Sequence, residues 1–405
     1  MRIWYLNHYA STPDQPMTGA YYLMQAMAEE GHDITVFASG FHYHRRKELR
    51  LSGRLFSKRE NFGPLKFIWI RTIPTTGRAL TRFLNMLSYT FVTLGVALFT
   101  KPKPEVIIAT CPHPFAGALG WALSKCFRAK FVYEIRDIWP ESLTEGGVVS
   151  TTHPLVRLMY HLQRFLYKRA DLVVSVLPKL DSYLEERHIA YQQFLWAPNC
   201  VLIDAEKLPT PHDIAYQPSP FIMMYLGGHS RYQRLYTLLD AALILQSQGV
   251  SSIRLVLVGD GSEKQNLIEK ARSMGLTNIE FWDSVPRSEI MSVAAKADAF
   301  LLHFQAVPLL KYGISNNKLC DYMLAARPIV FAAEAINNAV EETRSGVSIQ
   351  PENPQAMASA IQQLAQLSPA ERHEMSVRAQ AYAIEHYDVR KQAQKLTAVL
   401  AKISK

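Results

Sequence analysis

Short apolar runs alternate with longer helix-like stretches along the first half of the chain. Between most of the runs lie segments of helix length, such as Ala20–Glu30, Phe115–Phe127 and Pro154–Lys168. This order predicts a parallel βα sheet. Near-continuous apolar runs such as VIIAT and LVVSV indicate strands that helices cover on both faces. The strands predicted here are Ile3–Leu6, Ile34–Ala38, Phe67–Arg71, Val106–Thr110, Phe131–Glu134 and Leu172–Val176.

The same rhythm starts again at Phe221, where helix Leu235–Gln246 follows the first strand. Before it, Leu208–Pro220 holds four prolines and no apolar periodicity, which is typical of a linker. A length of 405 residues also favours two domains. The second set of predicted strands is Ile222–Leu226, Leu255–Val258, Ile279–Trp282, Phe300–His303, Pro328–Phe331 and Val347–Ile349.

The pattern therefore predicts an α/β protein with two Rossmann-like, doubly wound parallel-sheet domains. We place the domains at residues 1–207 and 221–385, with the linker at 208–220. The carboxyl ends of both sheets are expected to face one cleft, where such folds bind ligands.

Cysteine usage and the N-terminus indicate a cytoplasmic protein. The four cysteines lie far apart and form no CxxC pair, so neither a disulfide framework nor a zinc site is expected. The opening MRIWYLNHYA has the alternation of a strand and lacks the features of a signal peptide.

The excess of positive charge is confined to the first half of the chain. Residues 1–200 hold 24 Lys+Arg and 15 Asp+Glu, and the remainder holds 20 of each. Residues 42–82 alone carry eleven basic side chains against Glu48 and Glu60. Few aromatic residues lie among these charges and no recognition motif is present, so nucleic acid is a less favoured partner.

An apolar stretch, Phe83–Phe99, follows the basic segment, and four polar residues interrupt it. This composition is marginal for a membrane span. A basic segment leading into an apolar helix suits the anionic surface of a bilayer, so we predict peripheral membrane contact through residues 42–99. A buried helix behind a solvated loop is the alternative.

The stretch Lys311–Val330 has the features of a nucleotide-diphosphate site. Gly313 and Ser315 permit a tight turn, and Ser315 or Asn316 can cap the following helix. Lys318 falls in the first turn of that helix, where free backbone N–H groups favour an anion. Asp321, one turn further, suits ribose hydroxyls. Taken alone, the stretch fits an ordinary capped helix equally well.

Two glycine turns precede it along the second domain. Gly227 and Gly228 follow a predicted strand and let the backbone approach a phosphate, which Arg231 could clamp. The turn at 258–262 (VGDGS) follows the next strand. Neither turn contains GxGxxG, so a structural turn is the alternative. His42 and His44 lie in a basic loop without carboxylates, and the PHP of residues 112–114 is explained by a turn after the strand Val106–Thr110, so no metal site is predicted from these histidines.

Taken in order, these segments resemble the nucleotide-binding half of glycosyltransferase family 4. The N-terminal segment TGAYYLMQAMAEEGHDITVFAS is similar to the first loop, helix and second strand of that family. YEIRDIWPES, residues 133–142, resembles the N-acetylfucosaminyl transferase-like (WbuB-type) branch. The segments of the second half that carry the resemblance are YLGGHSRYQRLYTLLD, LVLVGDGSEKQNL, FWDSVPRSEI, ADAFLLHF, YGISNNKLCDYMLAARPIV and SGVSIQPENPQAMASAI.

The resemblance implies a GT-B fold that binds the donor mainly on the C-terminal domain, while the acceptor approaches the N-terminal one. The closing helix, about 386–405, would return to the first domain. The implied reaction is retaining transfer of a hexosyl or N-acetylhexosaminyl group from a nucleotide sugar, with UDP favoured and no metal or other cofactor. The implied acceptor is undecaprenyl-diphosphate-linked, for O-antigen or capsule synthesis on the inner face of the cytoplasmic membrane.

The resemblance also implies roles for individual residues. Two departures from the family stand out. Gly313 occupies the position of the first glutamate of the E-x7-E motif, and Arg136 stands where many members have histidine. The backbone N–H groups of residues 313–315 are expected to replace the missing carboxylate. The implied roles are diphosphate binding by Arg231, Lys318, Gly227, Gly228 and Gly19; ribose binding by Asp321; base binding by Trp282, Asp283 and Ser284; donor-sugar binding by Gly313, Ile314 and Ser315; and catalysis by Asp137, Arg136 and Glu141.

Other interpretations of the same residues stay open. Asp137 could cap a turn before Pro140, with Glu134 and Arg136 as a surface pair. The whole protein could be a sugar-nucleotide epimerase on the same fold, or a non-catalytic nucleotide-sugar-binding protein.

Overall fold

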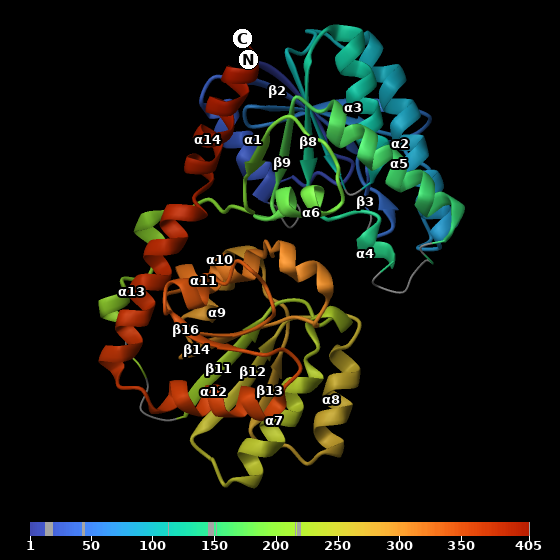
Figure 1. The fold of residues 1–405 in the computed structure, drawn as a ribbon. Helices are drawn as coiled ribbons and strands as arrows, with labels where there is room; N and C mark the ends of the chain where they lie inside the picture. The colour runs from blue at the N-terminus through green and yellow to red at the C-terminus, as the bar shows by residue number, and fades with distance from the viewer. Residues whose placement is uncertain are drawn as a thin grey trace. The chain divides into compact units, whose positions relative to one another are not determined.

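The computed structural model describes residues 1–12, 19–42, 45–111, 113–144, 150, 152–214, 216 and 220–404. The chain forms two α/β units (Figure 1). Unit 1 comprises Met1–Leu202 and Val389–Lys405, and unit 2 comprises Ile203–Asp388. Each unit is built on a parallel sheet, so the predicted fold class is confirmed.

Unit 1 contains a sheet of eight strands in the order β10-β9-β8-β7-β1-β2-β6-β5. All neighbours pair in parallel except β5 and β6, which are antiparallel. The order reverses at β1, whose neighbours are β7 and β2, so the switch point lies between β1 and β7. The strands are β1 (Arg2–Leu6), β2 (Asp33–Ser39), β5 (Ser57–Phe62), β6 (Leu65–Ile70), β7 (Val106–Cys111), β8 (Lys130–Ile135), β9 (Leu172–Ser175) and β10 (Phe194–Trp196), and β3 (Phe41–His42) pairs with β4 (Lys47–Glu48) apart from them.

Helices cover both faces of this sheet because successive residues of its central strands are apolar and buried. One face packs on α1 (Gly19–Glu29) and α14 (Val389–Ile403), and its strand residues include Ile3, Val36 and Ile108. The intervening residues face the other layer, where Trp4 packs on Phe127. That layer contains α2 (Ala79–Phe99), α3 (Pro114–Phe127) and α5 (Pro154–Arg169). The short helices α4 (Glu141–Thr144) and α6 (Leu180–Glu186) complete the unit.

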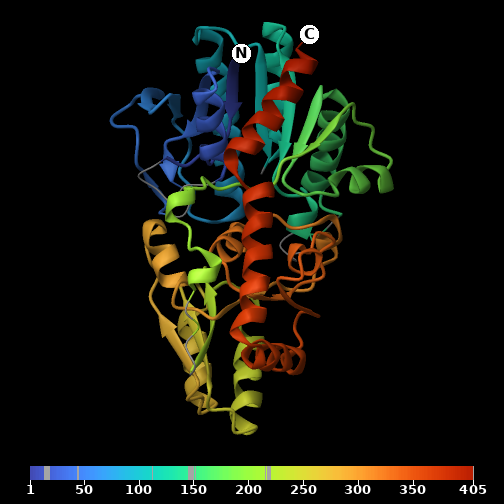
Figure 2. The ribbon, with the colours of Figure 1, turned by 90° about the vertical axis from the view of Figure 1, so that its left-hand side faces the viewer.

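The last helix returns to the first unit, beside the N-terminal helix. Figure 2 shows α14 running along unit 1, and α1 and α14 are in contact. Its buried residues join the core of the α1 face; they are Val389, Ala393, Leu396, Leu400 and Ile403.

Unit 2 has a wholly parallel sheet of six strands in the order β13-β12-β11-β14-β15-β16. This sheet also has a switch point, here between β11 and β14. One face packs on α7 (Tyr236–Ser247), α8 (Lys264–Ser273) and α12 (Pro354–Gln366). The strands are β11 (Phe221–Leu226), β12 (Ile253–Val258), β13 (Ile279–Trp282), β14 (Ala299–His303), β15 (Ile329–Ala332) and β16 (Gly346–Ile349).

The other face of this sheet carries α10 (Asn317–Leu324), which packs against α13 (Pro369–His386). Stacking of Tyr322 on Phe300, with ring centroids 4.2 Å apart, joins α10 to β14. The shorter helices of the unit are α9 (Ile290–Ala294), α11 (Ala339–Glu342) and the 3-10 turns η1 (Ala205–Lys207), η2 (Pro211–Asp213), η3 (Arg231–Gln233), η4 (Arg287–Glu289) and η5 (Pro308–Tyr312).

The described residues of the proline-rich segment 208–220 lie within unit 2 and are attached to α13. Gln380 donates a hydrogen bond to the Pro209 carbonyl at 2.8 Å, and the hydroxyls of Tyr216 and Ser376 lie 3.0 Å apart. The chain passes between the units at 202–203 and 388–389, whereas the sequence placed the linker at 208–220.

Candidate functional site

The first turn of α10 lies at the switch point of unit 2. Asn316 caps the helix, because its side chain accepts a hydrogen bond from the Lys318 N–H at 2.7 Å. The Tyr322 hydroxyl holds the helix against β11, since it accepts from the Leu226 N–H at 2.9 Å and donates to the Leu226 carbonyl at 3.0 Å. The turn that carries Lys318 is therefore fixed beside the end of β11.

Lys318 has neutral hydrogen-bond partners. Its Nζ donates to the Tyr225 hydroxyl at 2.6 Å and to Gln233 Oε1 at 3.0 Å. Desolvation lowers the pKa of Lys318 to about 7. Among the described residues no carboxylate forms a hydrogen bond with this ammonium group. A half-buried ammonium group of this kind at a helix N-terminus is suited to an anionic ligand.

Glycines lie at the two neighbouring strand ends, where Gly227 makes room for the Lys318 side chain and Gly259 for the backbone of Gly227. A Cβ on Gly227 would lie 2.1 Å from Lys318 Cε, and one on Gly259 would lie 1.9 Å from the Gly227 carbonyl oxygen. Both residues have positive φ angles, 153° and 146°. Gly228 differs, since the nearest atom to its Cβ position is 3.9 Å away. Gly227 and Gly259 are thus required by their surroundings and Gly228 is not.

His229, between these turns, is a residue that the sequence did not single out. Its side chain is fully buried, and among the described residues neither ring nitrogen has a hydrogen-bond partner. Burial, followed by the charges of Lys264 and Lys318, lowers the pKa of His229 to about 4. A neutral imidazole therefore lies close to both lysines.

Asp321 forms a two-point ion pair with Arg287, a residue that was not predicted from the sequence. The distances are 2.5 Å from Nη1 to Oδ2 and 2.6 Å from Nη2 to Oδ1. Burial raises the pKa of the Asp321 carboxyl above its ordinary value, and the hydrogen bond to Arg287 offsets only part of that rise. No sequence pattern links the two residues, which are 34 positions apart.

The Arg231 side chain, predicted to bind the diphosphate, pairs with Glu263 and does not contact Lys318 in this structure. Its side chain is 86% exposed and its Nε lies 3.4 Å from Glu263 Oε1. The side chain that meets Lys318 from this turn is Gln233. Arg231 would have to leave Glu263 to contact a phosphate beside Lys318.

The predicted base-binding residues lie at the end of β13, of which Trp282 is the last residue. The Trp282 carbonyl accepts hydrogen bonds from the Gly259 N–H at 3.3 Å and from Lys264 Nζ at 3.1 Å. Asp283 is exposed and pairs with Lys264 at 2.8 Å. Ser284 is exposed as well. This segment is therefore linked to the glycine turn at 259 through its backbone.

The loop predicted to hold the donor sugar is braced by Asn337. Its side chain accepts from the Ile314 N–H at 2.8 Å and donates to the Ile314 carbonyl at 2.7 Å. The Gly313 N–H donates to the Leu310 carbonyl at 2.9 Å. The N–H groups of Gly313 and Ile314 are thus engaged within the protein, so these two do not replace the missing carboxylate; for the Ser315 N–H the expectation stays a prediction. Ser315 follows in the same loop, half-buried.

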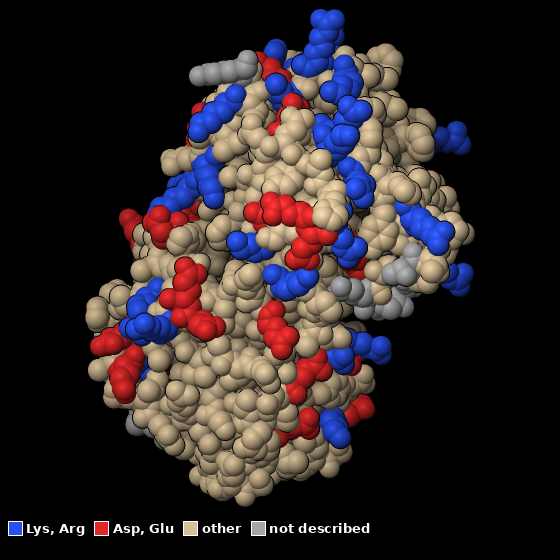
Figure 3. Space-filling model, in the orientation of Figure 1, with Lys and Arg blue, Asp and Glu red and all other residues tan. Residues whose placement is uncertain are grey.

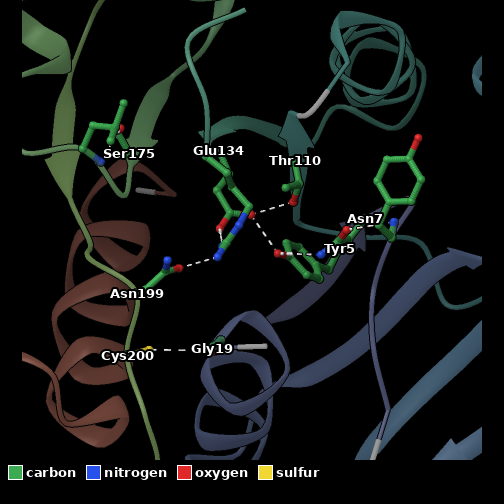
Figure 4. A network of polar contacts seen from close by, with 11 residues as sticks. Tyr5, Asn7, Gly19, Thr110, Glu134, Ser175, Asn199 and Cys200 are labelled. Carbon is green, nitrogen blue, oxygen red and sulfur yellow. Dashed lines mark hydrogen bonds and ion pairs between the residues drawn. The ribbon is translucent and has the colours of Figure 1, made fainter. Parts of the chain in front are cut away.

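In unit 1, polar side chains converge on Glu134 at the end of β8 (Figure 4). Its Oε2 accepts hydrogen bonds from Tyr5 at 2.7 Å and Thr110 at 2.6 Å, and Asn7 donates to the Tyr5 hydroxyl at 3.1 Å. Arg136 pairs with Glu134 Oε1 at 3.0 Å and also donates to Asn199 Oδ1. Burial alone would lower the pKa of Arg136, but Glu134, Tyr5 and Asp137 together outweigh burial and the pKa is raised.

The Arg136–Glu134 pair is mostly buried, because the Arg136 side chain is 23% exposed and that of Glu134 is 7% exposed. The alternative that these residues form a surface pair is therefore wrong. The network links β1, β7 and β8 to the segment around Asn199. Gly19 packs on the next residue, because a Cβ there would lie 2.6 Å from the Cys200 carbonyl oxygen. Gly19 therefore has a packing role within unit 1.

The other two predicted catalytic residues lie in different surroundings. Asp137 is exposed in the turn after β8. Glu141 is buried at the start of α4, where it accepts a hydrogen bond from Tyr183 and lies 3.8 Å from Arg187. These contacts are those of a carboxylate that attaches α4 to α6.

The histidines of the rejected metal interpretation have structural contacts. His42 Nδ1 accepts from the Arg45 N–H at 3.0 Å. His113 caps α3, and its Nε2 lies 2.8 Å from His8 Nδ1. His44 and Pro112 lie outside the described residues. No group of three His, Cys, Asp or Glu suited to a metal ion occurs in the described part of the chain.

Comparison with known proteins assigns a domain to each unit. The model of glycosyl transferase 4-like domains matches residues 17–200, and the model of glycosyl transferases group 1 matches residues 220–366. The chain is 22% identical to the probable glycosyltransferase WbjE of Pseudomonas aeruginosa over 286 residues, 67% of each protein.

Solved structures with the same fold span nearly the whole chain. Sucrose-phosphate synthase from Thermosynechococcus elongatus has a TM-score of 0.74 at 14% identity, and the superposition covers 99% of this chain and 98% of the synthase chain. Anabaena HepE in complex with UDP and glucose has a TM-score of 0.67 at 17% identity, covering 99% and 100%. WaaG, a glycosyltransferase involved in lipopolysaccharide biosynthesis, has a TM-score of 0.68 at 13% identity, covering 98% and 99%.

At these identities the structures establish the fold alone, and the two domain models add the class of enzyme. Unit 1 carries a glycosyl transferase 4-like domain and unit 2 a glycosyl transferases group 1 domain. The chain is therefore a glycosyltransferase of the GT-B type, which confirms the coarser part of the family resemblance.

Proposed function

We propose that this glycosyltransferase moves a hexosyl or N-acetylhexosaminyl group from a nucleotide-diphosphate sugar, with UDP favoured, to a lipid-linked acceptor. The observation that carries the proposal is the Lys318 ammonium group, which has neutral hydrogen-bond partners beside a helix N-terminus. A diphosphate supplies the negative charge that this environment favours.

The same geometry supports a mechanism in which protein groups neutralise the leaving diphosphate. Lys318 and the first turn of α10 stabilise the charge that develops when the bond between sugar and phosphate breaks. Asp321 binds the ribose, and the backbone after β13 binds the base. We propose that no metal ion or other cofactor is required.

We propose retention of configuration at the transferred sugar. The attacking hydroxyl then approaches the face from which the diphosphate departs, and a phosphate oxygen of the leaving group takes its proton. In unit 1, Arg136 and Asp137 are the proposed groups near the acceptor. The Glu134 network holds Arg136 in place, whereas Glu141 supports the fold.

Surface-polysaccharide assembly is the proposed setting, with an undecaprenyl-diphosphate-linked acceptor and the WbuB-type branch of the family. YEIRDIWPES at 133–142 supports the branch. WaaG, which shares the fold, is involved in lipopolysaccharide biosynthesis, and WbjE is a probable glycosyltransferase.

The outer face of α2 supports peripheral contact with the cytoplasmic membrane. The buried residues of this helix form a mostly polar stripe, Asn85, Tyr89, Thr93 and Ala97. The outward stripe is apolar; its exposed large side chains are Leu80, Leu84, Phe91, Leu98 and Phe99. A helix with its apolar face outward is suited to lie in a bilayer interface.

Length and composition would also allow this helix to cross a membrane, and 28% of its apolar window is buried. Its inner stripe is bonded into unit 1, however. The Tyr89 hydroxyl donates to the Phe37 carbonyl at 2.8 Å, and Asn85 donates to the Ile73 carbonyl at 2.7 Å. We therefore propose that α2 lies in the plane of the membrane.

Basic residues flank the helix, with Arg78 and Arg82 at its start and Lys101 and Lys103 after its end. Figure 3 shows Lys and Arg spread over unit 1, at the top of that view, with fewer acidic side chains among them. This charge suits anionic headgroups.

The membrane proposal is tested by sedimentation with vesicles. We expect the protein to bind phosphatidylglycerol-containing vesicles more tightly than phosphatidylcholine vesicles, and Phe91→Glu to weaken binding about tenfold or more. Leu243→Glu, at an exposed position of α7, is the control. Unchanged binding of Phe91→Glu, or protein that stays bound after high-salt and alkaline extraction, would overturn the in-plane model.

Transfer itself is tested with Lys318→Met. We expect its kcat/KM to fall about a hundredfold or more, since a charge-assisted contact to the leaving group is lost. Lys270→Met, an exposed lysine of α8, is the matched control. Product from donor alone would favour an epimerase, and nucleotide binding without transfer to any lipid-linked acceptor would favour a non-catalytic binding protein.

A further inference from the structure

Arg287 and Asp321 join two distant parts of unit 2 at the carboxyl edge of its sheet. Arg287 begins η4, in the connection after β13, and Asp321 lies on α10, which follows β14 in the chain. In the sheet, β12 and β11 lie between β13 and β14. The pair thus spans the strands whose ends carry the turns at Gly259 and Gly227.

The pair differs from a surface ion pair in geometry and in burial. Each carboxylate oxygen has its own guanidinium partner, at 2.5 Å and 2.6 Å. The Asp321 side chain is 7% exposed, whereas that of Arg287 is 42% exposed. A two-point contact of this kind fixes the plane of the carboxylate as well as its position.

We propose that Arg287 is a positioning residue for the donor ribose, because it holds the Asp321 carboxylate in one orientation in which its remaining lone pairs accept hydrogen bonds from the ribose hydroxyls. This inference rests on the proposed nucleotide-sugar site and adds a residue that determines its preference for a ribonucleotide.

Electrostatics support the same role. Burial raises the pKa of the Asp321 carboxyl, and Arg287 acts in the opposite direction through its hydrogen bond and its charge. Lys318, one turn earlier on the same helix, donates to Tyr225 and Gln233, and to no carboxylate in the part of the chain that the structure describes. Arg287 thus offsets part of the cost of ionising the buried Asp321 carboxyl, whereas the described hydrogen-bond partners of Lys318 supply no negative charge.

The experiment compares ribonucleotides with their 2′-deoxy forms. ADP, CDP, GDP and UDP are titrated into the full-length protein, and the tightest binder is then compared with its 2′-deoxy counterpart. We expect wild type to prefer the ribonucleotide by about tenfold or more, as a hydrogen bond to a charged acceptor allows. In Arg287→Gln the preference should fall to about onefold, with little change in affinity for the deoxy form.

Damage to the fold would weaken binding of both nucleotides equally. The ratio of the affinities for the ribonucleotide and its 2′-deoxy form therefore separates a positioning role from a loss of stability. Arg272→Gln, at an exposed position of α8, should keep the wild-type ratio. Arg287→Lys, which keeps the charge but loses the two-point contact, should give an intermediate ratio. Because Arg287→Gln leaves a buried carboxylate unpaired, the double variant Arg287→Gln/Asp321→Asn provides a neutral pair for a second measurement.

A pH series adds a signature that a purely structural residue would not give. In Arg287→Gln the carboxyl pKa rises, so its ribose preference should return only in part as the pH is raised, because the ionised Asp321 regains its charge but not its fixed orientation. A wild-type ratio in Arg287→Gln, or a wild type that does not distinguish the two nucleotides, would overturn the inference and leave the nucleotide site intact. Failure of wild type to bind any of the four nucleotides would instead overturn the proposed function, and this inference with it.

Discussion

At the scale of single residues, the lowered pKa of Lys318 gives donor binding an unusual dependence on pH. An ordinary lysine stays charged to about pH 10, but desolvation lowers the pKa of Lys318 to about 7. The charged form attracts the diphosphate. We therefore expect nucleoside-diphosphate affinity to fall as the pH rises above 7, by up to about tenfold per pH unit.

Calorimetric titration from about pH 6.5 to about pH 9 measures this effect. Lys318→Arg should flatten the profile, because a guanidinium stays protonated throughout the range. A wild-type affinity that does not change between pH 7 and pH 9 would contradict the lowered pKa.

Gly227 and Gly228 provide a second prediction at this scale. They are adjacent in the sequence, but a side chain at 227 would clash with its surroundings and one at 228 would not. Alanine at 227 places a Cβ 2.1 Å from Lys318 Cε at a φ of 153°, whereas the nearest atom to a Cβ at 228 is 3.9 Å away. We expect Gly227→Ala to displace the lysine and weaken nucleotide binding about tenfold or more, at a cost of about 1–3 kcal/mol in stability. Gly228→Ala should behave like wild type. Equal affinities in the two variants would show that Lys318 does not bind the nucleotide.

The sequence located these residues but not their partners. A capped helix after a strand was enough to place Lys318 and Asp321 at a helix N-terminus, because capping is a local property. Tyr225 is 93 positions from Lys318 and Arg287 is 34 from Asp321. Such pairs depend on strand order and loop path, for which a single sequence carries no local signal. The pairing of Arg231 with Glu263, 32 positions away, has no local signal either, and its predicted contact with the diphosphate stays a prediction.

At the scale of the helix, the cap of α10 connects stability with binding. Asn316→Ala removes the acceptor for the Lys318 N–H, and we expect a cost of about 1 kcal/mol in unfolding free energy together with weaker nucleotide binding. Asn338, which caps α11 by accepting from the Glu341 N–H at 3.2 Å, is the control. Asn338→Ala should cost a similar free energy in chemical denaturation and leave nucleotide affinity unchanged. A loss of affinity in both variants would mean that stability alone governs binding.

The element that sequence alone described least completely is α2. Its apolar composition predicted a helix, and Asn85 and Thr93 appeared only as interruptions. The structure shows that both polar residues belong to the buried stripe of the helix, whose members Asn85, Tyr89, Thr93 and Ala97 follow one another at intervals of four residues. Composition does not show which face of a helix packs inward, since both a membrane face and a core face are apolar.

At the scale of the whole molecule, the apolar rhythm was enough to predict two parallel sheets. Residues such as Val106–Cys111 and Leu172–Ser175 are wholly buried strands, and their continuous apolar runs are distinctive. The strand Ser57–Phe62 was missed because it is polar and largely exposed, and pairs only with β6. An edge strand of this kind has no apolar pattern to detect.

The division of the chain predicts how each unit responds to loss of the last helix. Truncation after Asp388 removes α14, whose buried residues Val389, Leu396, Leu400 and Ile403 belong to the core of unit 1. At about 1.5–3 kcal/mol for each large apolar side chain, the loss is comparable with the whole stability of a domain. Unit 2 keeps all its elements, since it comprises Ile203–Asp388.

We therefore expect the truncated protein to lose the thermal transition of unit 1 and to keep that of unit 2. A nucleoside diphosphate should still raise the midpoint of the remaining transition, because a ligand that binds only the native state stabilises it. Leu396→Ala in the full chain is the milder test, with an expected cost of about 2–5 kcal/mol confined to the unit 1 transition. If the midpoint of unit 2 fell as far as that of unit 1, the two units would unfold as one, and the nucleotide site could not be assigned to a unit that folds by itself.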